Sequence, residues 1–595
     1  MDNTPKQQVL NDEINLWWNE LDLAQKYKEK YGGSKSWDTY KNYYRGQFSG
    51  YSDIGRGKYG SILPYNITYA MARTLIPNLY FRNPYVNVTP RQKFGNSINL
   101  DITAKIVESM DNWLLQMMGT KQEMKSGLLG GFFTNKAIWK IGYDSQFGFR
   151  TKDTEPMLSN TATATQWNKK GERLEYNVNV KPGMPWVLSI PAEDFFVPFG
   201  VKKMDDAWWC AHRVIRQLKD VKGDPKYKNT TGLEGTHLER IYNELQKADF
   251  YKDLAKICDW VEIYEIRNRK TKEVLAIVPG FNQYIRPPED DVLQFDSLPF
   301  VDISFNEDPD YFWGPSDVKI MEPQQLEMNE AITQAMNHRR VALVKMLIDR
   351  NMIDASELDK MMSENVMPAI RVKGNPATVA SMLQPHIPPE LNIWVDKIRE
   401  NVRELIGFSR QDMGELPSGR RTASEVRVSQ AGKNMRIDER RDTVADALVD
   451  IVRKVNMVVF DRWDSERVIQ VVGYDAAKYW VRFNKSEIMG DYLYKVDVES
   501  MAPTNKEVKR KEIIELIGVL AKYPRANLDY MIKMLMREFE YVDMMQLFPN
   551  APESNASQPM TTQQFTQQQQ GLLNNPVQLG ARVKDNQMAI GGMMG

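Results

Sequence analysis

The sequence predicts an α+β protein with more than one hydrophobic core, and three observations support this. The chain has 595 residues, of which 42% are hydrophobic, so it is long enough for two or three sizeable cores. Short apolar or alternating segments, typical of strands, cluster between residues 137 and 312. Long stretches with apolar residues at helical spacing lie before and after that region.

The first 60 residues are rich in charge and in aromatic side chains. Residues 11–31 form a predicted helix that Gly32 and Gly33 end. Trp17, Trp18 and Trp37 favour a local core, with docking on a neighbouring molecule as the alternative. The glycine-rich stretch 51–60 lacks the full phosphate-loop pattern and is expected to be a connector.

The next region predicts a mixed domain. A helix starts at Ile62 and is broken at Asn83-Pro84, a strand covers 85–89, and amphipathic helices cover 100–118 and 121–133. A charged helix is expected over 218–253, and a hairpin turn at 267–272. The predicted strands are 137–143, 186–190, 195–198, 208–215, 259–267, 274–278 and 292–295.

The pattern changes near Trp313, where long helices take over. A helix over 318–347 and a second over 388–408 flank an insertion, 348–387, which is rich in methionine and proline and contains a possible strand at 369–372. A polar loop with three arginines follows, and then one long helical register runs over 422–463 with Gly432 as a possible kink.

The last part of the chain predicts returning strands, then helices, then a polar tail. The strands are 468–472, 480–483 and 494–498, and the helices are 505–522 and 528–545. Residues 551–595 are rich in Gln, Asn, Met and Gly, so we expect this segment to be disordered.

Composition restricts the function. The charges balance at 78 basic and 78 acidic residues, so any DNA contact must come from a local patch. Two cysteines, Cys210 and Cys258, exclude a disulfide framework. No signal peptide or 18-residue apolar run is present, so we expect a cytoplasmic origin and no membrane contact.

No catalytic constellation has adequate spacing. Nucleotide-binding, serine-hydrolase and zinc-protease motifs are absent. Glu262 and Glu265 lack the lysine two residues later that a Mg²⁺-dependent nuclease would favour. We therefore expect no enzymatic activity, no metal and no cofactor.

Several short motifs follow one another in a distinctive order along the chain. A Trp-Gly-Pro-Ser-Asp turn at 313–317 leads into a helix bearing Gln324-Gln-Leu-Glu-Met-Asn329, and the loop 414–426 runs into the long helix. The upstream matching segments are Leu63-Pro-Tyr-Asn66, Phe81-Arg-Asn-Pro84, Pro191-Ala-Glu-Asp-Phe-Phe-Val-Pro198, Asp205-Asp-Ala-Trp-Trp209 and His212-Arg213. In this order the motifs resemble those of the portal proteins of tailed bacteriophages, and most closely those of short-tailed phages. The resemblance covers most of residues 60–545.

The resemblance implies a virion protein that forms a ring, typically of twelve subunits, at one capsid vertex. Double-stranded DNA would pass through its channel during packaging and ejection. The implied partners are the terminase large subunit, head-tail adaptor and tail proteins, and the major capsid and scaffolding proteins. The implied parts are an N-terminal arm (1–60), an α+β wing (61–312), a first stem helix (313–347), a small α/β clip (348–387), a second stem helix (388–410), a tunnel loop (411–425), a long kinked helix (426–463), wing return strands (464–503), crown helices (504–550) and the tail (551–595).

The same resemblance selects candidate site residues, each with a plainer alternative. Loop cations would face DNA or pair with nearby carboxylates: Arg410, Arg420, Arg421, Arg427 and Lys433. Stem residues would line the bore or form inter-subunit ion pairs: Lys319, His338, Arg339, Arg340 and Lys345. Clip methionines would form a partner surface or fill a core: Met352, Met361, Met362 and Met367. The alternative functions are a phage DNA-processing enzyme, such as a terminase subunit or nuclease, and another structural component of the virion.

Overall fold

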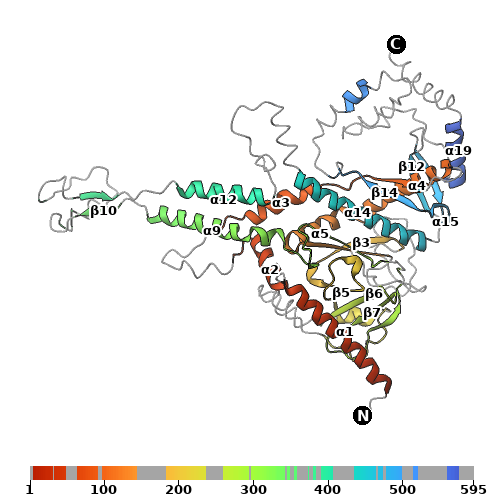
Figure 1. Ribbon diagram of the computed structural model, residues 1–595, viewed down its shortest axis with the longest axis horizontal. Coiled ribbons are helices and arrows are strands. Elements are labelled where there is room, and N and C mark those ends of the chain that lie inside the picture. Colours follow the sequence, from red (N-terminus) through yellow and green to blue (C-terminus); the bar gives the residue numbers. More distant parts are fainter. Residues whose placement is uncertain are drawn as a thin grey trace. The chain divides into compact units, whose positions relative to one another are not determined.

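The computed structural model of the chain confirms the α+β class, with helices and antiparallel sheets in one protein (Figure 1). It describes residues 5–30, 33–48, 63–91, 97–143, 183–224, 226–235, 259–291, 293, 297–341, 345–348, 354, 356–357, 373, 380–383, 390–406, 435–463, 467–472, 478–498, 501, 513–519 and 559–574. These residues fall into two compact units. Unit 1 contains Met1–Trp37, Arg73–Ser316 and Asn434–Gly595, and unit 2 contains Asp38–Ala72 and Asp317–Lys433.

The largest sheet of unit 1 is antiparallel throughout and has the order β4-β5-β6-β7-β8. Its strands are β4 (Phe195–Phe196), β5 (Trp209–Gln217), β6 (Trp260–Asn268), β7 (Glu273–Ile277) and β8 (Arg286–Asp290). Short 3-10 turns flank β4 at Ala192–Asp194 and Met204–Asp206. A small core on one face of the sheet includes Val221 of α6 (Leu218–Gly223) together with Val261 and Ile263 of β6.

Helix α1 (Pro5–Glu29) packs against the opposite face of this sheet through Ile14, Leu21 and Ala24. The tryptophans join that core, because the ring centroid of Trp17 lies 5.9 Å from that of Trp209 and the ring of Trp18 lies 5.4 Å from that of Tyr264. At the end of the helix, the buried ammonium of Lys28 donates to the carbonyls of Ala192 and Glu193 at 3.0 and 2.9 Å. The local-core interpretation of these tryptophans is therefore confirmed.

A second sheet of unit 1 has the order β3-β2-β9. The central strand β2 (Lys136–Tyr143) pairs antiparallel with β3 (Pro185–Ile190) and β9 (Phe300–Ser304), and all but its last residue are buried. Helix α5 (Thr120–Thr134) lies against it, and a Cβ on Gly127 would stand 2.6 Å from the indole of Trp139. Helix α14 (Met435–Arg462) also contacts this sheet, and Lys454 donates to the carbonyls of Leu298 and Phe300.

The strands after α14 return to unit 1. Strand β14 (Tyr492–Val496) pairs antiparallel with β1 (Val86–Pro90), and β12 (Arg467–Val472) pairs antiparallel with β13 (Lys478–Phe483). Helix α4 (Ser97–Met117) contacts both β1 and β12, and the short α15 (Lys485–Ile488) follows β13. Residues 513–519 are helical within the expected 505–522, whereas the expected 528–545 lies outside the described residues.

The expectation of a disordered tail was wrong for residues 559–574. Strand β15 (Met560–Thr561) pairs parallel with β13, and helix α19 (Thr562–Asn574) follows it. The Thr562 hydroxyl contacts the carbonyl of Arg482 at 3.1 Å and Glu487 Oε2 at 2.7 Å, and the buried ring of Phe565 lies 5.5 Å from that of Tyr479. The buried ring of Phe565 thus anchors a glutamine-rich segment whose composition alone predicted disorder.

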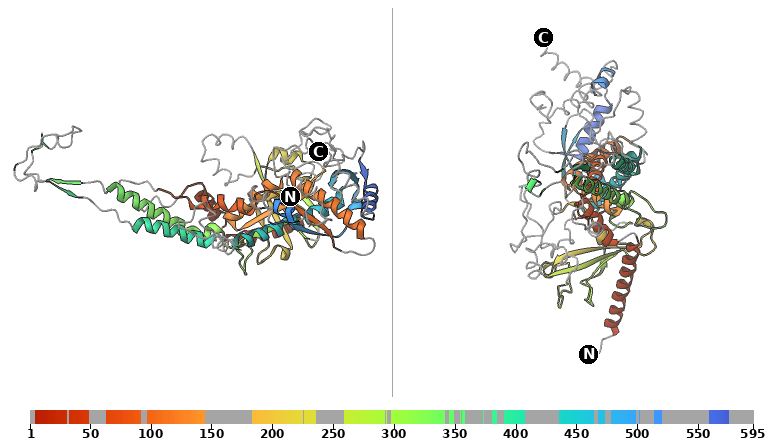
Figure 2. Two further views of the ribbon diagram at one scale, coloured as in Figure 1. Left: turned by 90° about the horizontal axis from the view of Figure 1, so that it is seen from above. Right: turned by 90° about the vertical axis from the view of Figure 1, so that its left-hand side faces the viewer.

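Unit 2 is mainly helical. Helix α9 (Asp317–Val341) and helix α12 (Glu390–Ile406) contact each other and lie side by side in the views of Figures 1 and 2. Strand β10 (Lys345–Ile348) pairs antiparallel with β11 (Ala380–Leu383). Helices α2 (Gly33–Tyr44) and α3 (Ile67–Leu79) each begin in one unit and end in the other.

Other sequence-based boundaries also need correction. The helix expected over 218–253 ends at Gly223, where Asp224 precedes a proline and accepts a hydrogen bond from the Lys226 amide, and residues 226–235 are not helical. The rest of the expected helix, 236–253, lies outside the described residues. Strands β8 and β9 were not predicted, and most of the expected strand 292–295 lies outside the described residues. The first long helix ends at Val341, earlier than expected. Among the described residues, no helix has the length and apolar character needed to span a membrane.

Candidate functional site

The helical pair of unit 2 has a buried seam and a partly apolar outer face. Ile398, Val402 and Ile406 are buried on α12, as the predicted stripe requires, and Met328 is buried on α9. Trp394, which belongs to the same predicted stripe, is 46% exposed and donates through Nε1 to Glu327 Oε1 at 3.0 Å. The apolar stripe predicted on α12 is therefore wider than the buried surface between α12 and α9.

Hydrogen bonds from Gln325 and Asn329 to the backbone of Tyr65 and Thr68 fix the segment 65–68 to α9, and we call this set of contacts the polar strap. Gln325 donates to the carbonyl of Tyr65 at 2.7 Å and accepts from the amide of Thr68 at 3.1 Å. Asn329 Oδ1 accepts from the amide of Tyr65 at 2.9 Å, and the guanidinium of Arg399 on α12 lies 4.7 Å from the Tyr65 ring centroid. Two motifs that carried the family resemblance, 63–66 and 324–329, thus contact each other directly.

The buried amides explain why a helix in this position contains glutamine and asparagine. Gln325 and Asn329 are 1% and 0% exposed, and a buried amide without hydrogen-bond partners would be strongly destabilising. The backbone of residues 65–68, which is not helical before Ile67, supplies partners for Gln325 and for Asn329 Oδ1. Asn329 Nδ2 has no hydrogen-bond partner among the described residues. The strap therefore fixes the segment that leads into α3 against α9.

The candidate stem residues do not converge on one place. Lys319 is exposed and lies 3.3 Å from Glu322, one turn along the same helix. His338 and Arg339 are exposed near the end of α9, about 28 Å from Lys319 at the helical rise per residue. Arg340 is in the same helix, but its side chain is not among those that the structure describes. Lys345 was expected on the helix and instead lies in strand β10, because α9 ends four residues earlier.

The other candidate residues fall outside the described part of the chain. This applies to the loop and long-helix cations Arg410, Arg420, Arg421, Arg427 and Lys433, and to Gly432. It also applies to Met352, Met361, Met362 and Met367 and to the possible strand 369–372. The expectations for these residues stay predictions.

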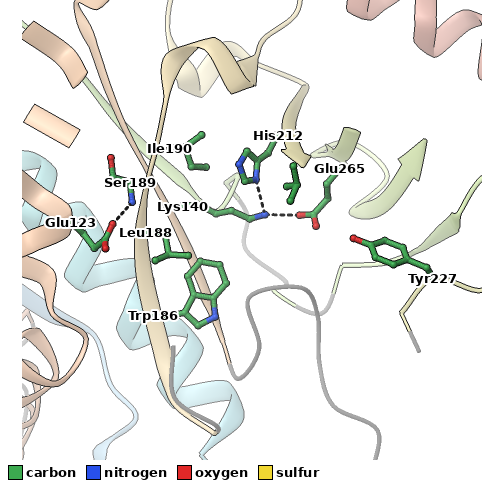
Figure 3. Close-up of a pocket in the computed structure, with 10 residues that line it drawn as sticks. Glu123, Lys140, Trp186, Leu188, Ser189, Ile190, His212, Tyr227 and Glu265 are labelled. Carbon is green, nitrogen blue, oxygen red and sulfur yellow. Dashed lines mark hydrogen bonds and ion pairs between the residues drawn. The ribbon is translucent and has the colours of Figure 1, made fainter. Parts of the chain in front are cut away.

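Sequence reasoning missed a buried ionic cluster in unit 1. Glu265 of β6 forms ion pairs with Lys140 of β2 at 2.8 Å, Lys226 at 2.9 Å and Arg267 at 3.2 Å. Lys140 Nζ also lies 3.4 Å from Nδ1 of His212 on β5. The cluster borders a cavity of about 140 Å³ (Figure 3), lined by Glu123, Lys140, Trp186, Leu188, Ser189, Ile190, His212, Val214, Tyr227 and Glu265.

Burial and charge set the protonation states in this cluster. Burial alone would raise the pKa of Glu265, but Lys140, Lys226 and Arg267 together hold it well below its usual value. Burial lowers the pKa of Lys226 to about 8, although Glu265 opposes that shift. Burial and the Lys140 ammonium also lower the pKa of His212 well below its usual value, which favours a neutral ring beside Lys140.

The cluster links two of the sheets of unit 1. Lys140 reaches from the three-stranded sheet to Glu265 in the five-stranded sheet. Glu265 Oε1 accepts from Lys140 and Arg267, and Oε2 accepts from Lys226, so both oxygens are occupied by cations. Within the described ranges, no group of three or more His, Cys, Asp or Glu residues could hold a metal ion. Lys140 is 125 residues from Glu265, so local spacing could not reveal the pair.

No protein-family model matches the chain, and no curated protein matches it in sequence.

Proposed function

We propose that this chain is a portal subunit: many copies form a ring around a channel at one capsid vertex, through which double-stranded DNA is packaged and ejected. The observation that carries the proposal is the order of elements in unit 2. A long helix, α9, is followed by the antiparallel ribbon β10–β11 and then by a second helix, α12, which contacts the first. That order matches the stem, clip and stem that the resemblance implies.

The polar strap and unit 1 add support. The strap attaches the segment 65–68, which leads into α3, to the α9–α12 pair. Unit 1 contains the strands expected of the wing, including β12, β13 and β14, which return after the long helix α14. A wing made from both ends of the sequence fits the proposed domain order.

The balanced charge suits a channel that must hold DNA without arresting it. Phosphate contacts do not depend on base sequence and weaken with salt, so a few cations per subunit, repeated around a ring, give an adjustable contact. In this proposal Arg420 and Arg421 supply such contacts from the loop before the long helix. Force for DNA movement comes from a partner ATPase, because the sequence lacks nucleotide-binding motifs.

The molecular mass in solution tests the proposal. Twelve copies of the 68.9 kDa chain would form a closed assembly of about 830 kDa, which light scattering after size-exclusion chromatography distinguishes from a monomer. We expect a species of roughly that mass, with small variation in subunit number. A monomer at all concentrations, together with ATP hydrolysis or DNA cleavage by the purified chain, would favour the DNA-processing enzyme instead.

A further inference from the structure

Two lysines and one exposed aromatic ring form a compact positive feature in unit 1. Phe81 lies two residues after α3 and is 45% exposed. Lys121 and Lys125 lie one turn apart at the start of α5, and their Nζ atoms are 5.7 and 5.4 Å from the Phe81 ring centroid. We call these three residues the lysine–phenylalanine patch.

The backbone around the patch is held in place by hydrogen bonds. The Phe81 amide donates to the carbonyl of Met501 at 2.9 Å, and Asn83 Nδ2 donates to the carbonyl of Leu115 at 3.1 Å. Gly119 adopts a left-handed conformation with φ 65°, which glycine tolerates without strain, and connects α4 to α5 at the base of the patch. The three side chains therefore project from a fixed backbone.

Among the described residues, the charges of the patch are not paired with carboxylates. Across the described part of the chain, neither Lys121 nor Lys125 forms an ion pair, whereas the exposed Lys26, Lys202 and Lys228 pair with Asp22, Asp310 and Glu289. Glu123 lies between the two lysines in sequence, but its carboxylate accepts from the amide of Ser189 at 2.8 Å. Burial and the neighbouring Lys121 lower the pKa of Lys125, as expected for like charges one helical turn apart.

We infer that the lysine–phenylalanine patch is a DNA-contact site that binds backbone phosphates. This inference rests on the proposed function, which supplies DNA as the anion that the chain meets. Ammonium groups bind phosphate as point charges without reading bases, which suits a protein that must accept any genome sequence. The ring adds favourable cation–π attraction that keeps both ammoniums at the same surface.

Charge-neutralising variants of the full-length assembly test the inference. We expect K121Q/K125Q to bind a short labelled DNA duplex on the order of tenfold or more weakly at 0.1 M salt, in fluorescence anisotropy. The slope of log affinity against log salt should become less negative by about 1.8, since two phosphate contacts are lost. K121R/K125R should keep both properties of the wild type.

A matched control is available on α6. Lys219 and Lys222 are exposed and one turn apart, and neither lies over an aromatic ring of the described residues, so K219Q/K222Q removes the same charge and should leave binding unchanged. Thermal melts of each variant establish that the proteins are folded. Equal loss of binding in both double variants would overturn the inference, as would a K121Q/K125Q protein with wild-type affinity and slope, or a wild-type assembly that does not bind DNA.

The oligomeric state of the same samples distinguishes the two proposals. If K121Q/K125Q forms rings and binds DNA as the wild type does, only the proposed phosphate site is contradicted. A wild-type protein that forms no ring contradicts the proposed function, whether or not the patch binds DNA.

Discussion

Replacing one buried carboxyl, Asp111, should stabilise the protein. Asp111 on α4 is fully buried beside α14, and its Oδ2 accepts from Asn456 Nδ2 at 3.0 Å. Its other oxygen, Oδ1, and the Asn456 Oδ1 atom have no hydrogen-bond partner. Burial raises the pKa of Asp111 well above its usual value, with Asn456 opposing the shift and Glu108 adding to it. A charged carboxylate is therefore unfavourable here.

The Asp111→Asn variant keeps the shape of the side chain and replaces an acceptor with a donor. An amide at this position can accept from Asn456 Nδ2 and donate to an oxygen that is now unpartnered. Satisfying a buried acceptor is typically worth about 1–3 kcal/mol, so we expect the free energy of unfolding of unit 1 to rise by roughly that amount at pH 8.

The pH dependence gives this prediction its sharpest test. The folded-state pKa of Asp111 lies above its unfolded value of 3.8, so wild-type stability falls as the pH rises through the interval between the two values. The gain from Asp111→Asn should therefore be large at pH 8 and shrink toward pH 4, where the carboxyl is protonated.

Urea unfolding followed by tryptophan fluorescence at several pH values measures this gain. The exposed Asp12→Asn serves as a control and should change little at any pH. The reasoning is refuted if Asp111→Asn destabilises the protein at pH 8, or if its gain does not depend on pH.

Three further predictions follow from packing and charge. Glu265→Gln leaves the buried cations without a counter-charge and should lower the free energy of unfolding by about 3–5 kcal/mol. The control Glu289→Gln changes a more exposed carboxylate and should lower it by less than about 1 kcal/mol. Similar losses for both variants in urea unfolding would contradict this prediction. Because the folded-state pKa of Glu265 is lowered, the stability that this carboxylate gives the protein is present above its unfolded pKa and is lost as the pH falls through the folded-state value. The stability of Glu265→Gln should therefore depend less steeply on pH in the acid range. An acid-unfolding profile identical to that of the wild type would count against the cluster. Phe565→Ala removes the anchor of α19, so limited proteolysis should cut near 559–574 faster than in the wild type; unchanged cleavage would mean that the ring is not the anchor.

The sequence predicted most element types where a local pattern extends over several turns. Helices α4, α5 and α12 follow amphipathic periodicity, and β6 and β7 follow apolar runs separated by a polar turn. Strand β8 was missed because Pro287 and Pro288 argue against a strand, although it pairs only with β7 and lies at the sheet edge, where proline is tolerated.

Features that depend on distant contacts could not be read from local spacing. The ionic cluster around Glu265 draws on three separate stretches of chain, and α19 is ordered through its contacts with β13 and α15. In the candidate site, the Gln325 and Asn329 motif was noticed, but its role in holding Tyr65 became evident only from the hydrogen bonds. The end of α9 was placed too late because the helix-forming residues 342–347 continue the pattern.

The central claim is that many copies of this chain surround an open channel. Negative-stain or cryogenic electron microscopy of the purified full-length protein, with class averages viewed along the symmetry axis, tests it most directly. We expect closed rings of about twelve subunits with a central opening wide enough for duplex DNA. Particles that are single, compact and without a central hole under every assembly condition would contradict the account.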